Sequence, residues 1–400
     1  MPSGGTHVVA HPPGRRARLP LAVAALLAAA SAGALVQPAQ AAQTPPPPQD
    51  RGLQRRLDQL VGAVGGPPGV IAVLKRGDRA EVYRAGVADI ETGRPPRPTD
   101  HMRLASLSKA YSGAVALRLV DQGRLTLDTT IGRRLPGLPA AWRKVTLRQL
   151  LNHTSGLPDF TASDDFRGIL SEDPHHVFDS RRLLEFAAGE PLAFPPGSRY
   201  QYSNSDNIAV ALMAEAATGR RYEDLLKHLV YHPLGLRQTS LPQGFRLPEP
   251  YLHGYAVDPP APPEDVTELF GSSGLWASGA VVATPKDLGR FIRGYAGGSL
   301  LSAHTRKEQL KFVPGGASEP AGPGVNSAGL AIFRYATRCG VLYGHTGNTA
   351  GYTQLAAATP DGKKSLTFSI TTQTSKSIKP ALLAQVRKAQ EDFACALLRR

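Results

Sequence analysis

The sequence predicts an α/β (α+β) fold, with an antiparallel sheet flanked by helices and an inserted, mainly helical domain. Two observations support this prediction. Runs rich in β-branched and aromatic residues lie near both ends of the chain, at 70–87 and 328–371. The residues between them have the spacing of apolar helices. We therefore expect a sheet domain built from 51–110 and 270–400, and a helical insert at 111–269.

The first elements are a helix and a hairpin. Leu53, Leu57 and Leu60 recur at helical spacing, and a glycine–proline run at 65–69 ends that helix. A buried strand, a turn and a returning strand follow. They are expected at 70–74, 76–78 and 81–87.

The insert is expected to hold four apolar helices, two of which end at a glycine. Their ranges are 110–122, 146–151, 208–218 and 222–230. Two further segments are rich in proline: 158–198 predicts short helices and acidic loops, and 241–265 predicts irregular structure.

The C-terminal part returns to the sheet after a helix at about 285–295. Asp361-Gly362 is a hairpin signal between the last two of four expected strands. These strands are 328–335, 340–344, 352–358 and 365–371, and a long helix at 378–398 follows them.

The N-terminal residues predict an export signal. A basic region with Arg15, Arg16 and Arg18 precedes an apolar run at 19–35, and a small-x-small cleavage site ends at Ala41. The apolar run is too short and interrupted to predict a transmembrane helix, so we expect no stable membrane anchor. The prediction is a signal peptide at 1–41, a proline-rich linker at 42–50, and a secreted, cell-wall-facing protein. Both the general secretion route and the twin-arginine route remain open.

The net charge of the chain narrows the class of partner that we expect. Removal of residues 1–41 lowers the net charge from +14 to +11, and no run of five basic residues occurs, so we expect no nucleic-acid binding. We expect a monomer.

Cys339 and Cys395 can form one disulfide in an oxidising compartment, worth roughly 4 kcal/mol in the chain-entropy model. Two separate buried thiols are the alternative.

Ser106 and Lys109 form the only Ser-x-x-Lys of the chain. On a helix they share one face, one turn apart. A partly desolvated lysine can lose its proton and then accept the serine proton, and the helix N-terminus favours the resulting oxyanion. The alternative is a serine N-cap followed by a solvated lysine.

Two further motifs follow in the sequence. Tyr202 and Asn204 form a Tyr-x-Asn, in which a phenol can act as general acid–base and an amide can hold a substrate carbonyl. His345-Thr346-Gly347 offers a ring nitrogen, a hydroxyl and close backbone approach. Each motif alone is weak, because a packed tyrosine at a turn is the default interpretation of the first and a strand end is that of the second.

The ordered set Ser-x-x-Lys, Tyr-x-Asn and His-Thr-Gly resembles the serine beta-lactamase and penicillin-binding-protein superfamily. Within it, the chain is most similar to secreted serine DD-carboxypeptidase/transpeptidases and class C beta-lactamases. The resemblance covers nearly all of 51–398. It includes the segments 123–128, 151–157, 233–236 and 253–255, and Cys339-Gly340 with Cys395.

The resemblance implies a role for each motif residue. Ser106 is the acylated nucleophile, Lys109 and Tyr202 move its proton, and His345 supports this network. The remaining residues bind substrate: Asn204 orients the amide, Thr346 binds the carboxylate, Gly347 allows close approach, and the N–H groups of Ser106 and Asn348 form the oxyanion hole. No metal or organic cofactor is implied.

Two departures from the family pattern bear on the substrate. Family members of the carboxypeptidase type have an arginine directly after the Gly-Leu strand, but here Phe333 stands there and Arg334 follows one place later. A shift of one residue moves a side chain to the other face of a strand. Asn348 also replaces a threonine.

The resemblance therefore implies an exported serine hydrolase, most similar to D-alanyl-D-alanine carboxypeptidases and reactive with penicillin. Its substrates would be peptidoglycan stem peptides and beta-lactams. A beta-lactamase or an esterase of the same fold is the alternative, and a catalytically inactive cell-wall or peptide-binding protein is the alternative from another class. We expect His153 to brace a loop, and leave open whether Phe160, Phe166 and Trp276 line the substrate cleft or pack in the core.

Overall fold

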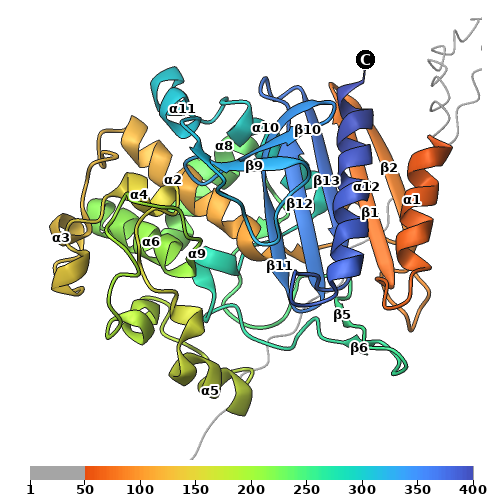
Figure 1. Ribbon diagram of the computed structural model, residues 1–400, viewed down its shortest axis with the longest axis horizontal. Helices are drawn as coiled ribbons and strands as arrows, with labels where there is room; N and C mark the ends of the chain where they lie inside the picture. Colours follow the sequence, from red (N-terminus) through yellow and green to blue (C-terminus); the bar gives the residue numbers. More distant parts are fainter. Residues whose placement is uncertain (1–49, 400) are drawn as a thin grey trace, which may run out of the picture. The chain divides into compact units, whose positions relative to one another are not determined.

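The computed structural model describes residues 50–399, in which an eight-stranded antiparallel sheet stands beside a region of helices (Figure 1). The first and last strands of the chain pair with each other, because β1 lies between β2 and β13. In spatial order the strands are β2 (Arg79–Gly86), β1 (Gly69–Arg76), β13 (Lys364–Ile370), β12 (Tyr352–Ala358), β11 (Gly340–Thr349), β10 (Phe333–Thr337), β9 (Val325–Ala328) and β8 (Val313–Pro314).

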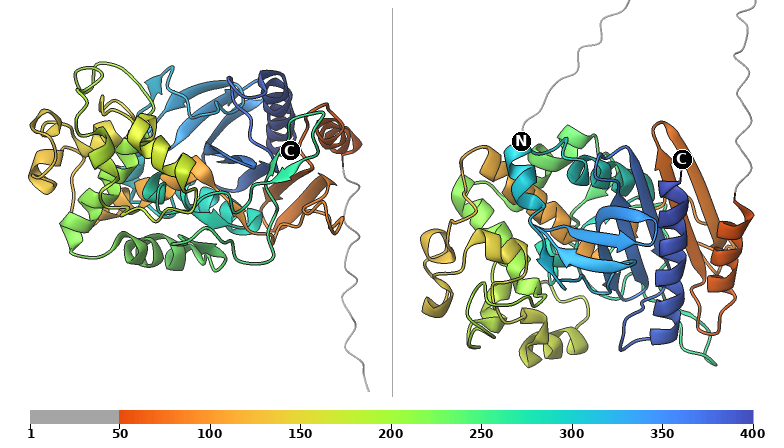
Figure 2. Two further views of the ribbon diagram at one scale, coloured as in Figure 1. Left: turned by 90° about the horizontal axis from the view of Figure 1, so that it is seen from below. Right: turned by 45° about the horizontal axis from the view of Figure 1, so that its top comes forward.

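Helices cover both faces of this sheet (Figure 2). On one face α1 (Arg51–Val61) and α12 (Pro380–Leu398) bury their leucines against the strands. On the other face α10 (Pro285–Ala296) packs against β12 and β13, and its apolar residues join those of the helical region in one core. Asp50 accepts hydrogen bonds from the N–H groups of Gly52 and Leu53 and so caps α1.

The remaining helices form the helical region, and α2 to α6 lie on the left of Figure 1. Helix α2 packs against α6 and α9 and is almost entirely buried. The helices are α2 (Ser108–Asp121), α3 (Ile131–Arg134), α4 (Leu147–Leu151), α5 (Asp164–Glu172), α6 (Asn204–Thr218), α7 (Tyr222–Leu226), α8 (His232–Leu234), α9 (Trp276–Gly279) and α11 (Ala303–Gln309).

Short elements connect the two parts. A small sheet orders β3 (Met102–Arg103), β7 (Val282–Ala283) and β4 (Thr239–Ser240), and β5 (Tyr255–Ala256) pairs with β6 (Glu264–Asp265). Single turns of 3₁₀ helix occupy η1 (Ala105–Leu107), η2 (Ala140–Trp142), η3 (Phe160–Ala162) and η4 (Leu183–Ala187), and η5 (Lys227–Tyr231) is a π-helical turn.

The predicted fold class is confirmed, but several predicted boundaries are wrong. The strand predicted at 340–344 continues to Thr349 as β11. The run 328–335 is not one strand: β9 and β10 are separated by a turn in which Gly329 N–H bonds the carbonyl of Ile332 and Ala331 has φ +52°. The helix predicted at 208–218 begins at Asn204 instead. The predicted split into a sheet domain and a helical insert stays a prediction.

The structure pairs Cys339 with Cys395, with Cα atoms 5.1 Å apart, and so joins α12 to the turn between β10 and β11. Within residues 50–399 we find no helix with the length and apolar character needed to cross a bilayer. The predicted signal peptide, and the predicted linker up to residue 49, lie outside the described residues.

Candidate active site

Ser106 sits in η1, on the turn that leads from β3 into α2. The turn is held from both sides. Leu104 N–H bonds the carbonyl of Val281, and Gly347 of β11 approaches so closely that a Cβ on it would lie 2.1 Å from the Leu104 oxygen. Ala105, directly before Ser106, has φ +50°, a conformation that costs energy for a residue with a side chain. The half-buried Ser106 is therefore fixed by its surroundings rather than by its own turn.

Lys109 is the centre of the site. Its side chain is completely buried, and its Nζ lies 3.1 Å from Ser106 Oγ, 2.7 Å from Asn204 Oδ1 and 2.7 Å from the carbonyl oxygen of Ser278 in α9. The starts of α2 and α6 and the short α9 thus meet at one ammonium, next to β11 (Figure 1).

Burial lowers the pKa of Lys109 from 10.5 to about 7, because the ammonium loses its hydration. The negative charges of Asp159, Asp206 and Glu319 oppose this decrease. A large share of the lysine is therefore a neutral amine at neutral pH, and such an amine can accept a proton.

Asn204, the first residue of α6, is held by both ends of its amide. The oxygen accepts from Lys109, and Nδ2 donates to Asp159 Oδ2 at 2.9 Å. Asp159 also accepts from the Asn204 backbone N–H and from Thr161. The network determines which way the amide points, and it directs the amide oxygen at Lys109.

Tyr202 packs its ring against the same lysine, with Nζ 5.0 Å from the ring centroid. Its hydroxyl is buried and makes no hydrogen bond of normal geometry with any described residue, although Ser106 is near enough to lower the pKa of the phenol. Burial is the larger effect and raises the pKa of Tyr202 far above 10. The phenol is therefore protonated at neutral pH, and Lys109 is the group prepared to accept a proton.

A buried pair beneath Tyr202 was not predicted as part of the site. The ring of His153 lies 4.5 Å from that of Tyr202, and its Nδ1 is 2.7 Å from Asp206 Oδ2. Ser155 donates to the other carboxylate oxygen. Burial lowers the pKa of His153 to about 3 and raises that of Asp206 well above its ordinary value. His153 therefore braces Tyr202. The sequence could have indicated this role through the position of His153 in the Asn152–Leu157 segment.

His345 is completely buried in β11. Its Nδ1 lies 2.6 Å from the carbonyl oxygen of Thr346, its ring packs 4.9 Å from that of Phe333, and its Nε2 has no partner among the described residues. Burial lowers the pKa of His345 to about 3, and the charge on Lys109 contributes. The imidazole is therefore neutral at neutral pH, and its predicted role in the proton network stays a prediction.

The other predicted binding residues also lie on β11, but two of their side chains are already engaged. Thr346 Oγ1 is 2.6 Å from Ser318 Oγ and 2.6 Å from the carbonyl oxygen of Pro320, and the residue is 1% exposed. Asn348 Oδ1 accepts from Thr353. The structure therefore joins Ser106, Lys109, Tyr202 and Asn204 directly, whereas Thr346 contacts the segment 318–320.

The aromatic residues that were left open are buried. Phe160 and Phe166 pack edge to face in the core of the helical region, and Trp276 is 1% exposed and donates to Glu223. Phe333 is also buried, and Arg334 is half-buried opposite Tyr343 in the sheet.

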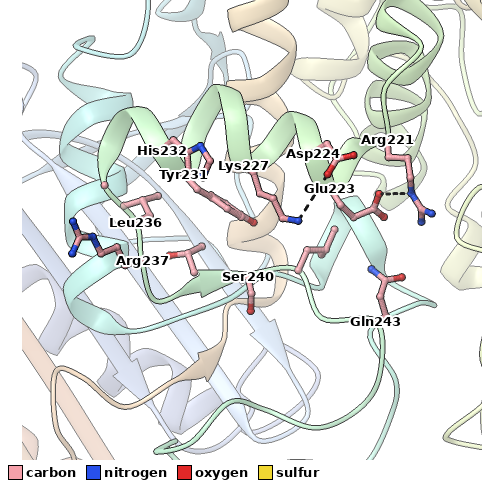
Figure 3. A pocket seen from close by; sticks show the side chains of 13 residues that line it. Arg221, Glu223, Asp224, Lys227, Tyr231, His232, Leu236, Arg237, Ser240 and Gln243 are labelled. Carbon is pink, nitrogen blue, oxygen red and sulfur yellow. Dashed lines mark hydrogen bonds and ion pairs between the residues drawn. The ribbon is translucent and has the colours of Figure 1, made fainter.

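A cavity of about 860 Å³ lies elsewhere, beside α7, α8 and β4. Figure 3 shows charged side chains such as Lys227 and Asp224 at its wall, and it contains none of the predicted site residues. No cluster of three or more metal-ligating side chains occurs within residues 50–399.

Comparison with known proteins identifies the family. The model of the family described as Beta-lactamase matches residues 53–391. The chain belongs to the beta-lactamase family. Its members include penicillin-binding proteins, D-aminopeptidases and esterases, so this beta-lactamase-family chain is a serine hydrolase by family.

Relatives of several activities resemble the chain. Penicillin-binding protein 4* of Bacillus subtilis is 26% identical over 75% of this chain and 67% of its own length. Esterase EstB of Burkholderia gladioli is 34% identical over 50% of the chain and 52% of its own length, and a D-aminopeptidase of Cereibacter sphaeroides is 30% identical over 51% and 38%. The chain thus spans about half of EstB and less of the D-aminopeptidase.

Solved structures extend the similarity over most of the chain. The D-amino acid amidase from Ochrobactrum anthropi SV3 matches with a TM-score of 0.74 and 26% identity, over 86% of this chain and 99% of that one. A D-stereospecific amidohydrolase from Streptomyces sp. matches with a TM-score of 0.73 and 28% identity, over 85% and 98%.

Proposed function

We propose that the chain cleaves amide or ester bonds of small substrates through an acyl-enzyme on Ser106, with Lys109 as the general base. One observation carries this proposal. A neutral amine has two N–H groups and one lone pair, and Lys109 has three oxygen partners. The oxygens of Asn204 and Ser278 can only accept, so they take the two N–H groups. The lone pair is left for the one partner with a proton to give, Ser106.

The reaction then follows from these positions. As Ser106 Oγ attacks the carbonyl carbon, its proton moves to Lys109 Nζ and the carbonyl oxygen becomes an oxyanion. The bond from that carbon to the leaving nitrogen or oxygen breaks, and the leaving group takes a proton. Tyr202, protonated and beside both residues, is the proposed donor for this step, and the proton held by Lys109 then replaces the one that Tyr202 gave. Water attacks the acyl carbon and gives a proton to Lys109, the bond from that carbon to Ser106 Oγ breaks, and Oγ takes the proton from Lys109 as the carboxylic acid leaves.

The proposed substrate class is supported by the activities named for the relatives. Amidases, D-aminopeptidases and an esterase among them favour small amides and esters. A second candidate is the predicted penicillin-reactive D-alanyl-D-alanine carboxypeptidase, favoured by the penicillin-binding proteins among the relatives. Secretion after cleavage near Ala41, and a monomeric state, are proposed with it from the sequence alone.

The test uses two probes on the purified chain and on Ser106→Ala, with exposed Ser377→Ala as the matched control. We expect p-nitrophenyl butyrate hydrolysis to fall at least a thousandfold in Ser106→Ala and to be unchanged in Ser377→Ala. A fluorescent penicillin, a D-Ala-D-Ala peptide and nitrocefin then separate the candidates. Absence of both ester hydrolysis and any Ser106-dependent adduct would favour the inactive binding protein.

A further inference from the structure

The segment 316–320 covers the side of the site formed by Thr346 and Tyr200. Its backbone is fastened there at two points. Tyr200 donates to the carbonyl of Ala317, and Thr346 lies within hydrogen-bond distance of both Ser318 and Pro320. Gly316 packs so closely on Tyr200 that a Cβ on it would lie 2.9 Å from the ring. The segment is therefore a fixed wall of the site.

The segment 316–320 engages the Thr346 hydroxyl, which is the group predicted to bind a substrate carboxylate. The carbonyl of Pro320 can only accept, so the Thr346 hydroxyl donates its single hydrogen to it. Nothing on that hydroxyl remains to be donated to a substrate, and the residue is 1% exposed. A substrate carboxylate would have to displace the protein's own backbone to bind there.

Glu319 stands between Ser318 and Pro320. Its negative charge is opposite to the charge that would attract a carboxylate. It is exposed, and its carboxylate makes no hydrogen bond or ion pair within residues 50–399. Its charge reaches the site, because it raises the pKa of Lys109, Tyr200 and Tyr202. Asp159, a half-buried acid at the site, already accepts hydrogen bonds from Asn204 and Thr161 on its two oxygens.

We propose that Glu319 is a specificity-determining residue that binds a protonated amino group on the acyl half of the substrate. This inference rests on the proposed function. The substrate class it implies is a short peptide, amide or ester with a free ammonium beside the scissile carbonyl. A free carboxylate at this wall of the site meets the like charge of Glu319 and is disfavoured.

The test compares D-alanine p-nitroanilide, which has a free amine, with its N-acetyl counterpart, which has none. The variants are Glu319→Gln, Glu319→Lys and the control Asp78→Asn. Asp78 lies in the exposed turn between β1 and β2, separated from β11 by β13 and β12, so its variant makes the same charge change away from the site.

We expect the wild-type chain to prefer the free amine. Glu319→Gln should lower kcat/KM for that substrate about five- to tenfold, mainly through KM, and leave the N-acetyl substrate unchanged. Glu319→Lys should lower it further and accelerate acylation by penicillin, which carries a carboxylate. Asp78→Asn should change none of these rates.

Two results overturn the role of Glu319. One is a wild-type chain that hydrolyses the N-acetyl anilide as fast as the free-amine anilide, or hydrolyses neither. The other is a Glu319→Gln variant that slows both anilides equally, because that is a structural effect. Hydrolysis of p-nitrophenyl butyrate, which has no charge near its carbonyl, separates these outcomes from failure of the proposed function. If only the role of Glu319 is wrong, this hydrolysis persists. If the proposed function is wrong, this hydrolysis is absent.

Discussion

Lowering the pH from 8 to 6 should slow acylation of Ser106 about tenfold. The reason is the buried Lys109, whose pKa lies at about 7. Only the neutral amine can take the serine proton, and its fraction falls from about nine-tenths at pH 8 to about one-tenth at pH 6. Because the pKa of this group is lowered on folding, the active form predominates above the midpoint and is lost as the pH falls through it.

Other titrating groups can be separated from Lys109. His153 and His345 have pKa values of about 3 and stay neutral across this range. Asp206 is the exception, because burial raises its pKa well above the ordinary value. In Asp206→Asn a midpoint should therefore persist, but at lower pH, because the Asp206 charge also raises the pKa of Lys109. The midpoint should also move down in Glu319→Gln, because the Glu319 charge raises the pKa of Lys109, and should stay in place in Asp78→Asn.

The assay is the burst of p-nitrophenol release from p-nitrophenyl butyrate, followed by stopped flow at the isosbestic wavelength of the leaving group. This readout reports acylation and is insensitive to ionisation of the product. A rate that is flat from pH 5 to 9, that falls with rising pH, or that has its midpoint near 10 would refute the reasoning that a neutral Lys109 is the base.

Three further predictions concern the supports of the site. Gly347→Ala places a Cβ 2.1 Å from the Leu104 oxygen, so it should lower stability by about 3 kcal/mol in urea unfolding and kcat/KM at least a hundredfold. Gly168→Ala, whose Cβ meets open space, should leave activity intact, and equal effects of the two changes would contradict the close approach. Tyr202→Phe keeps the ring against Lys109 but should reduce kcat about a hundredfold without moving the pH midpoint; a change below threefold would exclude the phenol as proton donor. Cys339→Ser with Cys395→Ser should lower the unfolding free energy by roughly 4 kcal/mol and leave ester hydrolysis unchanged, since α12 packs on the sheet face opposite α10 and the α2 core; a loss of activity in the folded variant would show that the disulfide shapes the site.

The sequence was sufficient to predict that the side chains of Ser106, Lys109, Tyr202 and Asn204 meet. Ser106 and Lys109 lie one helical turn apart, and the order of the three motifs matches a known family, so their convergence could be inferred before the fold was known. The fold class followed from strand-rich ends and an apolar helical middle. The ends of α2 and α6 were predicted well, because a glycine follows each, whereas β11 continues through Gly344, where the predicted strand ended.

One partner of Lys109 could not be predicted in this way. It is a backbone carbonyl, that of Ser278, 169 residues away, and a carbonyl has no sequence signature. The same holds for the segment 318–320, which reaches Thr346 through a carbonyl and a serine hydroxyl. The break at 329–332 was missed because its residues are apolar and continue the pattern of a strand, while tertiary hydrogen bonds to Leu151 and Gln309 hold the turn.

The most direct test of the central claim is to identify the residue that carries the acyl group. The chain is mixed with p-nitrophenyl butyrate, quenched in acid during the burst, and analysed by intact mass and peptide mapping. We expect one butyryl group per chain, on the peptide containing Ser106, formed about tenfold more slowly at pH 6 than at pH 8 and absent in Ser106→Ala. A butyryl group on another residue, or ester turnover in Ser106→Ala equal to that of the wild-type chain, would contradict it.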